Sequence, residues 1–189
     1  MTTAGGWVPT LGSSCARAST AAETRFRIDG PEPTPRATRV IALDTGAAEL
    51  VAAAAVDRPW QGAHFLAFER ALPIGDADAI TVDAVVRGEA ATDAVLRAAD
   101  GRESRLGAEL DDADVAVMVA TSDEHAEAAR SIGAACARRG IMTAALVVPG
   151  PGEARTVDRT VAMLRPFAMV LLVSNDASDL PEVLTALRA

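Results

Sequence analysis

The residues best placed to do chemistry stand directly after an apolar run in the middle of the chain. Residues 115–119 read Val-Ala-Val-Met-Val and are followed by Thr121-Ser122-Asp123-Glu124-His125. Ser122 and His125 are the residue types of a nucleophile and its base, but residues one helical turn apart rarely have the required geometry, and the Gly-x-Ser-x-Gly elbow is absent. A histidine beside carboxylates could instead bind a metal ion. A solvated helix start is the simpler interpretation, because the chain has no Cys-x-x-Cys, His-Glu-x-x-His or EF-hand spacing.

Further polar loops follow apolar runs in the same way. Residues 39–43 lead into Asp44-Thr45-Gly46, residues 64–68 into Glu69-Arg70, and residues 169–173 into Ser174-Asn175-Asp176. Parallel strands end at one edge of their sheet, and ligands of open α/β sheets bind outside that edge. A small nucleotide-binding protein or enzyme of this kind would use Thr45, Gly46, Thr121, Ser122 and Asn175. An acidic metal-dependent hydrolase would need four other side chains within a few ångströms of each other: Asp44, Asp123, His125 and Asp176.

The spacing of apolar residues predicts one complete βαβ unit around the central loop. Residues 115–119 and 141–148 have the unbroken apolar pattern of strands that are buried on both faces. Between them lies an Ala-rich helix of about four turns, whose apolar face is formed by Ala128, Ile132, Ala135 and Cys136. The end of that helix is marked by two arginines and then by Gly140.

Strands and helices alternate along the rest of the chain. The pattern predicts a three-layer, Rossmann-like, doubly wound α/β domain with a mostly parallel sheet. Further strands are expected at residues 39–43, 64–68 and 169–173. Helices are expected at residues 47–56, 90–99, 102–110, 155–165 and 180–187. Residues 80–86 fit either a strand or a loop, and the sequence Pro-Gly-Pro-Gly at 149–152 predicts a loop.

The composition divides the chain into a tail and one domain. Residues 1–37 are rich in Gly, Ser and Pro and lack a periodic apolar pattern, so we expect a flexible tail, in which Phe26 and Ile28 could add a short edge strand. Residues 38–189 are long enough for a single α/β domain with a real core. Cys15 falls in the tail and Cys136 on a helix face, so we expect a reduced, cytoplasmic protein in which Cys136 is a buried small hydrophobe.

The charge and residue usage exclude several classes of function. A net charge of -8 argues against nucleic acid or an anionic membrane surface as the main partner, because both require a basic footprint. The chain contains no lysine, which excludes a Walker-type phosphate lysine and a Schiff-base lysine. No apolar run approaches the ~18 residues of a membrane span, and we expect neither a signal peptide nor a structural metal.

Several segments, taken in order, resemble the nucleotide-binding domain of the tubulin and FtsZ family. RVIALDTGAAEL at 39–50 and GAHFLAF at 62–68 look like the family's first strand and turn and its Gly-x-x-Phe-[Ile/Leu]-Ala strand. DADVAVMVATS, RRGIMTAALVV and VLLVSND look like its strand ending in Thr-Ala-Gly, its Leu-Gly-x-Leu-Thr strand and its strand ending in Pro-Asn-Asp. The resemblance covers roughly residues 38–189 and none of the family's second domain. It implies a GTP or GDP site, in which Glu153 would take the place of a ribose-contacting Glu, although the family's Phe-x-Phe pattern is absent.

The departures from the family concern the phosphate loops. The family's central loop is glycine-rich because the backbone must approach the phosphates closely, whereas this chain has SDEHAEAA at 122–129. We expect Asp123, Glu124 and Glu127 to cap the helix that follows and to repel a triphosphate. The family's activating carboxylates, which follow its central helix, have no counterpart here.

The sequence therefore favours a degenerate FtsZ/tubulin-like domain without polymer-coupled GTPase activity. Its expected role is that of a protein-interaction or assembly subunit that associates with itself or with a protein partner, without a catalytic residue or a bound cofactor. The alternative is a small Rossmann-like nucleotide-binding protein or enzyme that binds GTP or another nucleotide at the strand-end loops.

Overall fold

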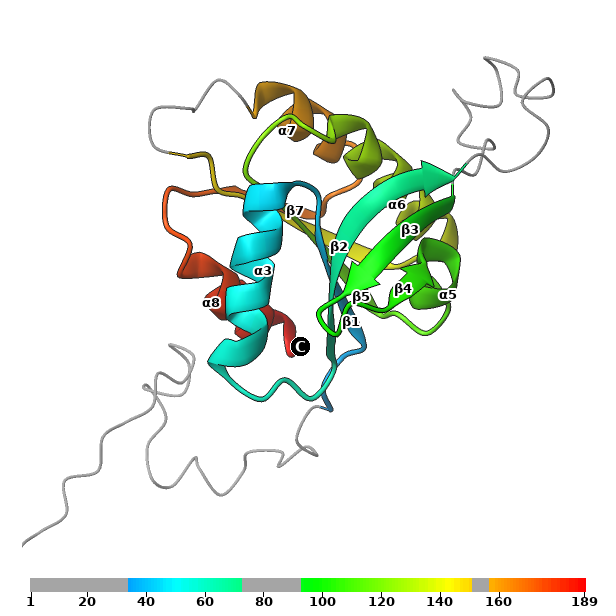
Figure 1. Ribbon diagram of the computed structural model, residues 1–189, viewed down its shortest axis with the longest axis vertical. Helices are drawn as coiled ribbons and strands as arrows, with labels where there is room; N and C mark the ends of the chain where they lie inside the picture. Colours follow the sequence, from blue (N-terminus) through cyan, green and yellow to red (C-terminus); the bar gives the residue numbers. More distant parts are fainter. Residues whose placement is uncertain (1–33, 73–92, 151–156) are drawn as a thin grey trace, which may run out of the picture. The chain divides into compact units, whose positions relative to one another are not determined.

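The computed structural model describes residues 34–72, 93–150 and 157–189, which are drawn in colour in Figure 1. The strands in these ranges are β1 (Thr38–Ala42), β2 (Ala63–Leu72), β3 (Asp93–Ala98), β4 (Glu103–Arg105), β5 (Val115–Ala120), β6 (Met142–Val147) and β7 (Val170–Val173). The helices are α3 (Thr45–Asp57), α5 (Leu106–Asp111), α6 (Ala126–Arg139), α7 (Asp158–Leu164) and α8 (Asp179–Leu187).

The strands form a seven-stranded sheet in the order β4-β3-β2-β1-β5-β6-β7. Strands β2, β1, β5, β6 and β7 run parallel to one another, whereas β3 is antiparallel to both β2 and β4. The strand order reverses between β1 and β5, so the loops after these two strands form the switch point at which such sheets usually bind ligands.

Helices cover both faces of this sheet, which confirms the predicted three-layer α/β fold (Figure 1). On one face, Ile41 and Met118 of the sheet form a core together with Ile132 of α6 and with side chains of α5 and α7. On the other face, Val40, Val117 and other side chains pack against α3 and α8. Because the central strands are covered on both sides, they contain almost only apolar residues.

The central βαβ unit is confirmed as β5, α6 and β6. Every residue of β5 is fully buried, in agreement with its unbroken apolar sequence. Gly140 ends α6 with a left-handed φ of 68°, and its N–H bonds to the last carbonyls of the helix. Only glycine adopts this conformation without steric cost, so the helix ends where the sequence predicts.

The antiparallel end of the sheet differs from the prediction. Residues 93–98, inside the helix expected at 90–99, are strand β3, which pairs with β2 through the register Phe68↔Leu96. Likewise, residues 103–105 of the second expected helix are strand β4, and the helix α5 begins only at Leu106. Alanine-rich sequences have high helix propensity, but pairing with β2 buries Leu96 completely, and this tertiary gain outweighs the local preference.

The other predicted elements agree with the structure to within a few residues, apart from those that lie outside the described residues. The latter are the expected edge strand at Phe26 and Ile28, the segment 80–86, the residues 151–156 and the tail as far as residue 33. Residues 34–37, which we expected in the tail, belong to the same compact unit as the domain, and Ala37 N donates to Asp114 Oδ2 at 3.0 Å. Within the described ranges, no helix has the length and apolarity that a membrane crossing requires.

Candidate functional site

The switch point between β1 and β5 is occupied by the side chain of Asp44. This carboxylate is 5 % exposed and is the N-cap of α3, where Oδ1 accepts from Ala47 N at 2.8 Å. Its Oδ2 accepts from Thr121 N at 2.7 Å and from Ser122 N at 3.0 Å. Thr121 Oγ1 donates to Oδ1 at 2.5 Å. Three backbone N–H groups that could bind the oxygens of a phosphate therefore bind a carboxylate of the protein itself.

Four of the six predicted nucleotide-binding residues lie at this switch point. Thr45 and Gly46 begin α3, while Thr121 and Ser122 follow β5. A Cβ atom at Gly46 would overlap Thr121 Oγ1, so the glycine allows the two loops to approach each other. In a phosphate loop, glycine lets the backbone come close to the phosphate. Here Gly46 instead lets the loop after β1 come close to the loop after β5.

Of the remaining two predicted residues, Asn175 is not part of this cluster. Asn175 is exposed in the loop after β7, and β6 separates β7 from β5 in the sheet. Neighbouring strands are about 4.8 Å apart, so Asn175 lies roughly two strand spacings away from Thr121. Glu153 lies outside the described residues.

The acidic residues of the central loop act differently from the prediction. We expected Asp123 to cap α6, but its carboxylate accepts from the N–H groups of Arg159 at 3.2 Å and Thr160 at 2.7 Å, so it caps α7. Thr160 Oγ1 returns a hydrogen bond to Ser122 O at 2.9 Å. The N-cap residue of α6 is His125, which makes no side-chain cap hydrogen bond. The predicted cap is wrong because α7, far away in sequence, brings its own free N–H groups to the same carboxylate.

The described residues do not bring together the side chains of the nucleophile and metal sites that the sequence left as alternatives. The ring of His125 packs against Phe68 with a centroid distance of 5.2 Å, whereas Ser122 Oγ accepts from Glu124 N at 3.3 Å. Asp176 caps the turn before α8, where the N–H of Ser178 lowers the pKa of its carboxyl group. Among the described residues, no group of three or more His, Cys, Asp or Glu side chains is placed to hold a metal ion. The geometric requirement of the metal-dependent hydrolase is therefore not met there.

A cavity of roughly 380 Å³ lies beside the switch point, between the first turns of α6 and the strands β2 and β3. Its apolar wall includes Phe68, Ala94 and Ile132, and its rim carries Glu69, Arg70, Glu124, Glu127 and Arg159. Several of these charges are paired within the protein: Arg159 Nη2 donates to Glu127 Oε1 at 2.6 Å, and a hydrogen bond from Arg97 lowers the pKa of Glu69. The sequence predicts a ligand loop at Glu69 and Arg70, but β2 continues through both residues to Leu72, because this part of the strand pairs with β3. The sequence contains no signal that Phe68 lies under the N-terminus of α6.

His64 and Cys136, the remaining two candidate residues, make contacts that are typical of residues with a structural role. His64 is exposed on β2, and its Nδ1 lies 3.4 Å from Glu109 Oε2, which also forms an ion pair with the buried Arg39. Cys136 is a fully buried free cysteine in the core beneath α6, as predicted, and burial raises the pKa of its thiol to about 11. Neither residue is placed for nucleophilic or metal chemistry.

Comparison of the chain with protein-family models, curated proteins and solved structures finds no match.

Proposed function

We propose that this domain is a protein-interaction or assembly subunit whose Rossmann-like framework does not use a nucleotide. The observation that carries the proposal is the exposed apolar edge of the sheet at β7, where Val170 is 58 % and Val173 is 51 % exposed. A contiguous apolar surface at a sheet edge is typical of a protein-binding site, because the edge also offers unpaired backbone groups. In this proposal the chain contains a divergent relative of the tubulin and FtsZ nucleotide-binding domain, supported by the order of the sequence landmarks.

The Asp44 carboxylate supports the absence of nucleotide binding at the switch point. A phosphate oxygen there would have to displace the carboxylate from Ala47 N, Thr121 N and Ser122 N, or lie beside its negative charge. The acidic side chain of Glu124, two residues after Ser122, adds to the repulsion. The proposal includes a cytoplasmic location and no nucleic-acid or membrane partner, in keeping with the net charge of -8.

Isothermal titration with GTP and GDP, with and without Mg²⁺, tests this part of the proposal. We expect no binding at micromolar nucleotide, and micromolar binding of either nucleotide would contradict it. Asp44→Asn is the informative variant, since it removes the charge and keeps the side-chain shape. If the charge excludes anions, phosphate should stabilise the Asp44→Asn variant against heat more than it stabilises the parent.

The cavity beside Phe68 favours a second candidate function, the binding of a small molecule or nucleotide. Its volume of roughly 380 Å³ falls within the range of ligand pockets, and it combines an apolar wall with a charged rim. Ser131 lines the cavity from α6, so Ser131→Trp would fill it. A ligand that binds the parent and not this variant would support the second function, and the titrations above should be repeated with this pair.

A further inference from the structure

The strand β7 is an unprotected edge of the sheet. It pairs with β6 on one side, and within the described residues no strand pairs with its other side. Four apolar side chains in and beside this strand are exposed: Met169 by 75 %, Val170 by 58 %, Leu172 by 37 % and Val173 by 51 %. The segment 169–173 contains no charged residue and no proline, which are the usual means by which proteins prevent edge pairing.

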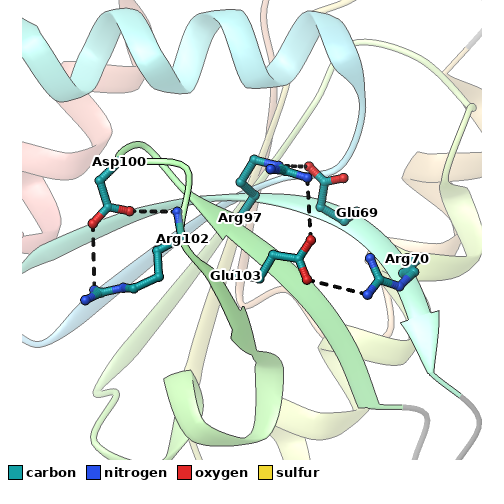
Figure 2. Close-up of polar contacts among 6 residues, drawn as sticks. All are labelled: Glu69, Arg70, Arg97, Asp100, Arg102 and Glu103. Atoms are coloured by element: carbon teal, nitrogen blue, oxygen red, sulfur yellow. Dashed lines mark hydrogen bonds and ion pairs between the residues drawn. The ribbon is translucent and has the colours of Figure 1, made fainter.

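The opposite edge of the sheet is protected by charge. The edge strand β4 has only three residues, Glu103, Ser104 and Arg105. Figure 2 shows the network beside it, in which Arg97 bonds to Glu69 at 2.6 Å and lies 3.6 Å from Glu103, while Arg70 lies 3.5 Å from Glu103. Another strand that paired with β4 would have to remove water from the charged side chains of Glu103 and Arg105 in the edge strand itself, which is unfavourable. A head-to-tail filament through β4 and β7 is therefore disfavoured, and the remaining arrangement is symmetric, β7 against β7.

The charges that flank β7 indicate the partner and its direction. The exposed Arg165 precedes the strand and the exposed Asp176 follows it, with no other charged residue between them. A two-fold axis reverses the direction of the second strand, so the basic end of one edge meets the acidic end of the other. A parallel arrangement would place like charges together.

Building on the proposed function, we propose that the partner is a second copy of this chain, whose β7 pairs antiparallel with the first β7 across a two-fold axis. The two sheets then form one continuous sheet, and the apolar side chains of both edges are buried against each other. Backbone hydrogen bonds supply affinity in such strand addition. Because β7 has only four residues, the contact is short, and we expect a dissociation constant in roughly the micromolar range or weaker.

Sedimentation velocity of the full chain, from about 1 to about 300 µM, tests the dimer. We expect a reversible shift from monomer to dimer. Val170→Lys places a charge in the edge and should weaken dimerisation at least about tenfold, which is a difference of about 1.4 kcal/mol. Val56→Lys is the matched control, because Val56 is 84 % exposed on α3 and the same change there should leave the dimer unaffected.

A second pair of variants tests the antiparallel direction. Arg165→Glu brings acidic groups together across the two-fold axis and should weaken the dimer, more so at low salt. Arg102→Glu makes the same change of charge at the β4 end, where the Arg102 side chain is 80 % exposed, and should have no effect. Equal effects of the two variants would overturn the antiparallel arrangement.

Hydrogen exchange of β7 separates failure of this inference from failure of the proposed function. A chain that stays monomeric while the β7 amides that face away from β6 exchange freely would overturn the second copy as partner, but the edge would remain open to another protein. A dimer that is insensitive to Val170→Lys would overturn β7 as the surface and leave self-assembly intact. Protection of these outward-facing amides in the monomer at the lowest concentration would overturn both, since the edge would then be covered within the chain.

Discussion

At the scale of single residues, the structure is defined by buried polar groups that bind partners far away in the sequence. Asp44 joins the loop after β1 to the loop after β5 through hydrogen bonds from Thr121 and Ser122, and Asp123 joins the central loop to α7. Hydrogen bonds to a charged group contribute about 1.5–3 kcal/mol each, so these carboxylates hold together the loops in which a ligand would otherwise be expected. The buried thiol of Cys136 has the opposite character, because burial disfavours its charged form.

The thiol of Cys136 should make the protein less stable at alkaline pH. Burial raises the pKa of this thiol from 9.0 to about 11. The thiol ionises first in the unfolded chain, so its contribution to stability is complete below about pH 9 and is lost as the pH rises towards 11, by about 2–3 kcal/mol. Urea unfolding at several pH values should show this loss.

The chain is well suited to this measurement because it has no lysine or tyrosine to titrate in the same range. Cys136→Ala is the control: the variant lacks the buried thiol, so its stability should depend much less on pH. Parallel pH profiles for the variant and the parent would contradict the assignment to Cys136.

At the scale of elements, α6 makes the contacts that hold together the face of the sheet on which the cavity lies. It covers the core on one face of the sheet, its first turns line the cavity, and α7 packs beside it. A close contact occurs at Gly133, where an added Cβ would lie 2.6 Å from ring atoms of Phe167. Glycine inside a helix costs about 1 kcal/mol relative to alanine, so its presence at this position is explained by packing.

Substitution of Gly133 by alanine should therefore destabilise the protein, by about 1–3 kcal/mol, despite the better helix propensity of alanine. Thermal or urea unfolding measures the effect. Gly107→Ala in α5 is the matched control, because the nearest atom to its added Cβ is 3.7 Å away. We expect that change to be neutral or to stabilise by up to about 1 kcal/mol. A stable Gly133→Ala protein would show that Phe167 can move aside.

At the scale of the whole described domain, the inner strands of the sheet are buried, and its two edge strands differ in charge and apolarity. The inner strand β5 is fully buried, and the β4 edge carries ion pairs (Figure 2). The β7 edge exposes apolar side chains, and within the described residues no further strand lies beside it. The switch point lies beside β5 and is occupied by protein groups, whereas the β7 edge exposes apolar side chains.

This division predicts the order of amide hydrogen exchange across the sheet. Peptides that cover β5 should exchange slowest, because its amides are released only by global unfolding. Peptides that cover β4 should exchange fastest among the strands, since β4 is short and exposed at the edge. Exchange mass spectrometry at a concentration where the chain is monomeric measures this order. Fast exchange in β5 would contradict the position of β5 inside the sheet, between β1 and β6.

The sequence by itself determined those features that depend on neighbouring residues. The unbroken apolar run before Thr121, the left-handed stop at Gly140 and the alternation of strands and helices are local patterns, and the three-layer fold followed from them. Only the tertiary structure decided which strand pairs with which, and therefore that residues 93–98 form a strand and that β7 is an edge. It also decided that Asp44 accepts from the loop after β5 and that Asp123 caps α7. A carboxylate's partner depends on the donors that folding brings to it from distant parts of the chain, and no local spacing carries that information.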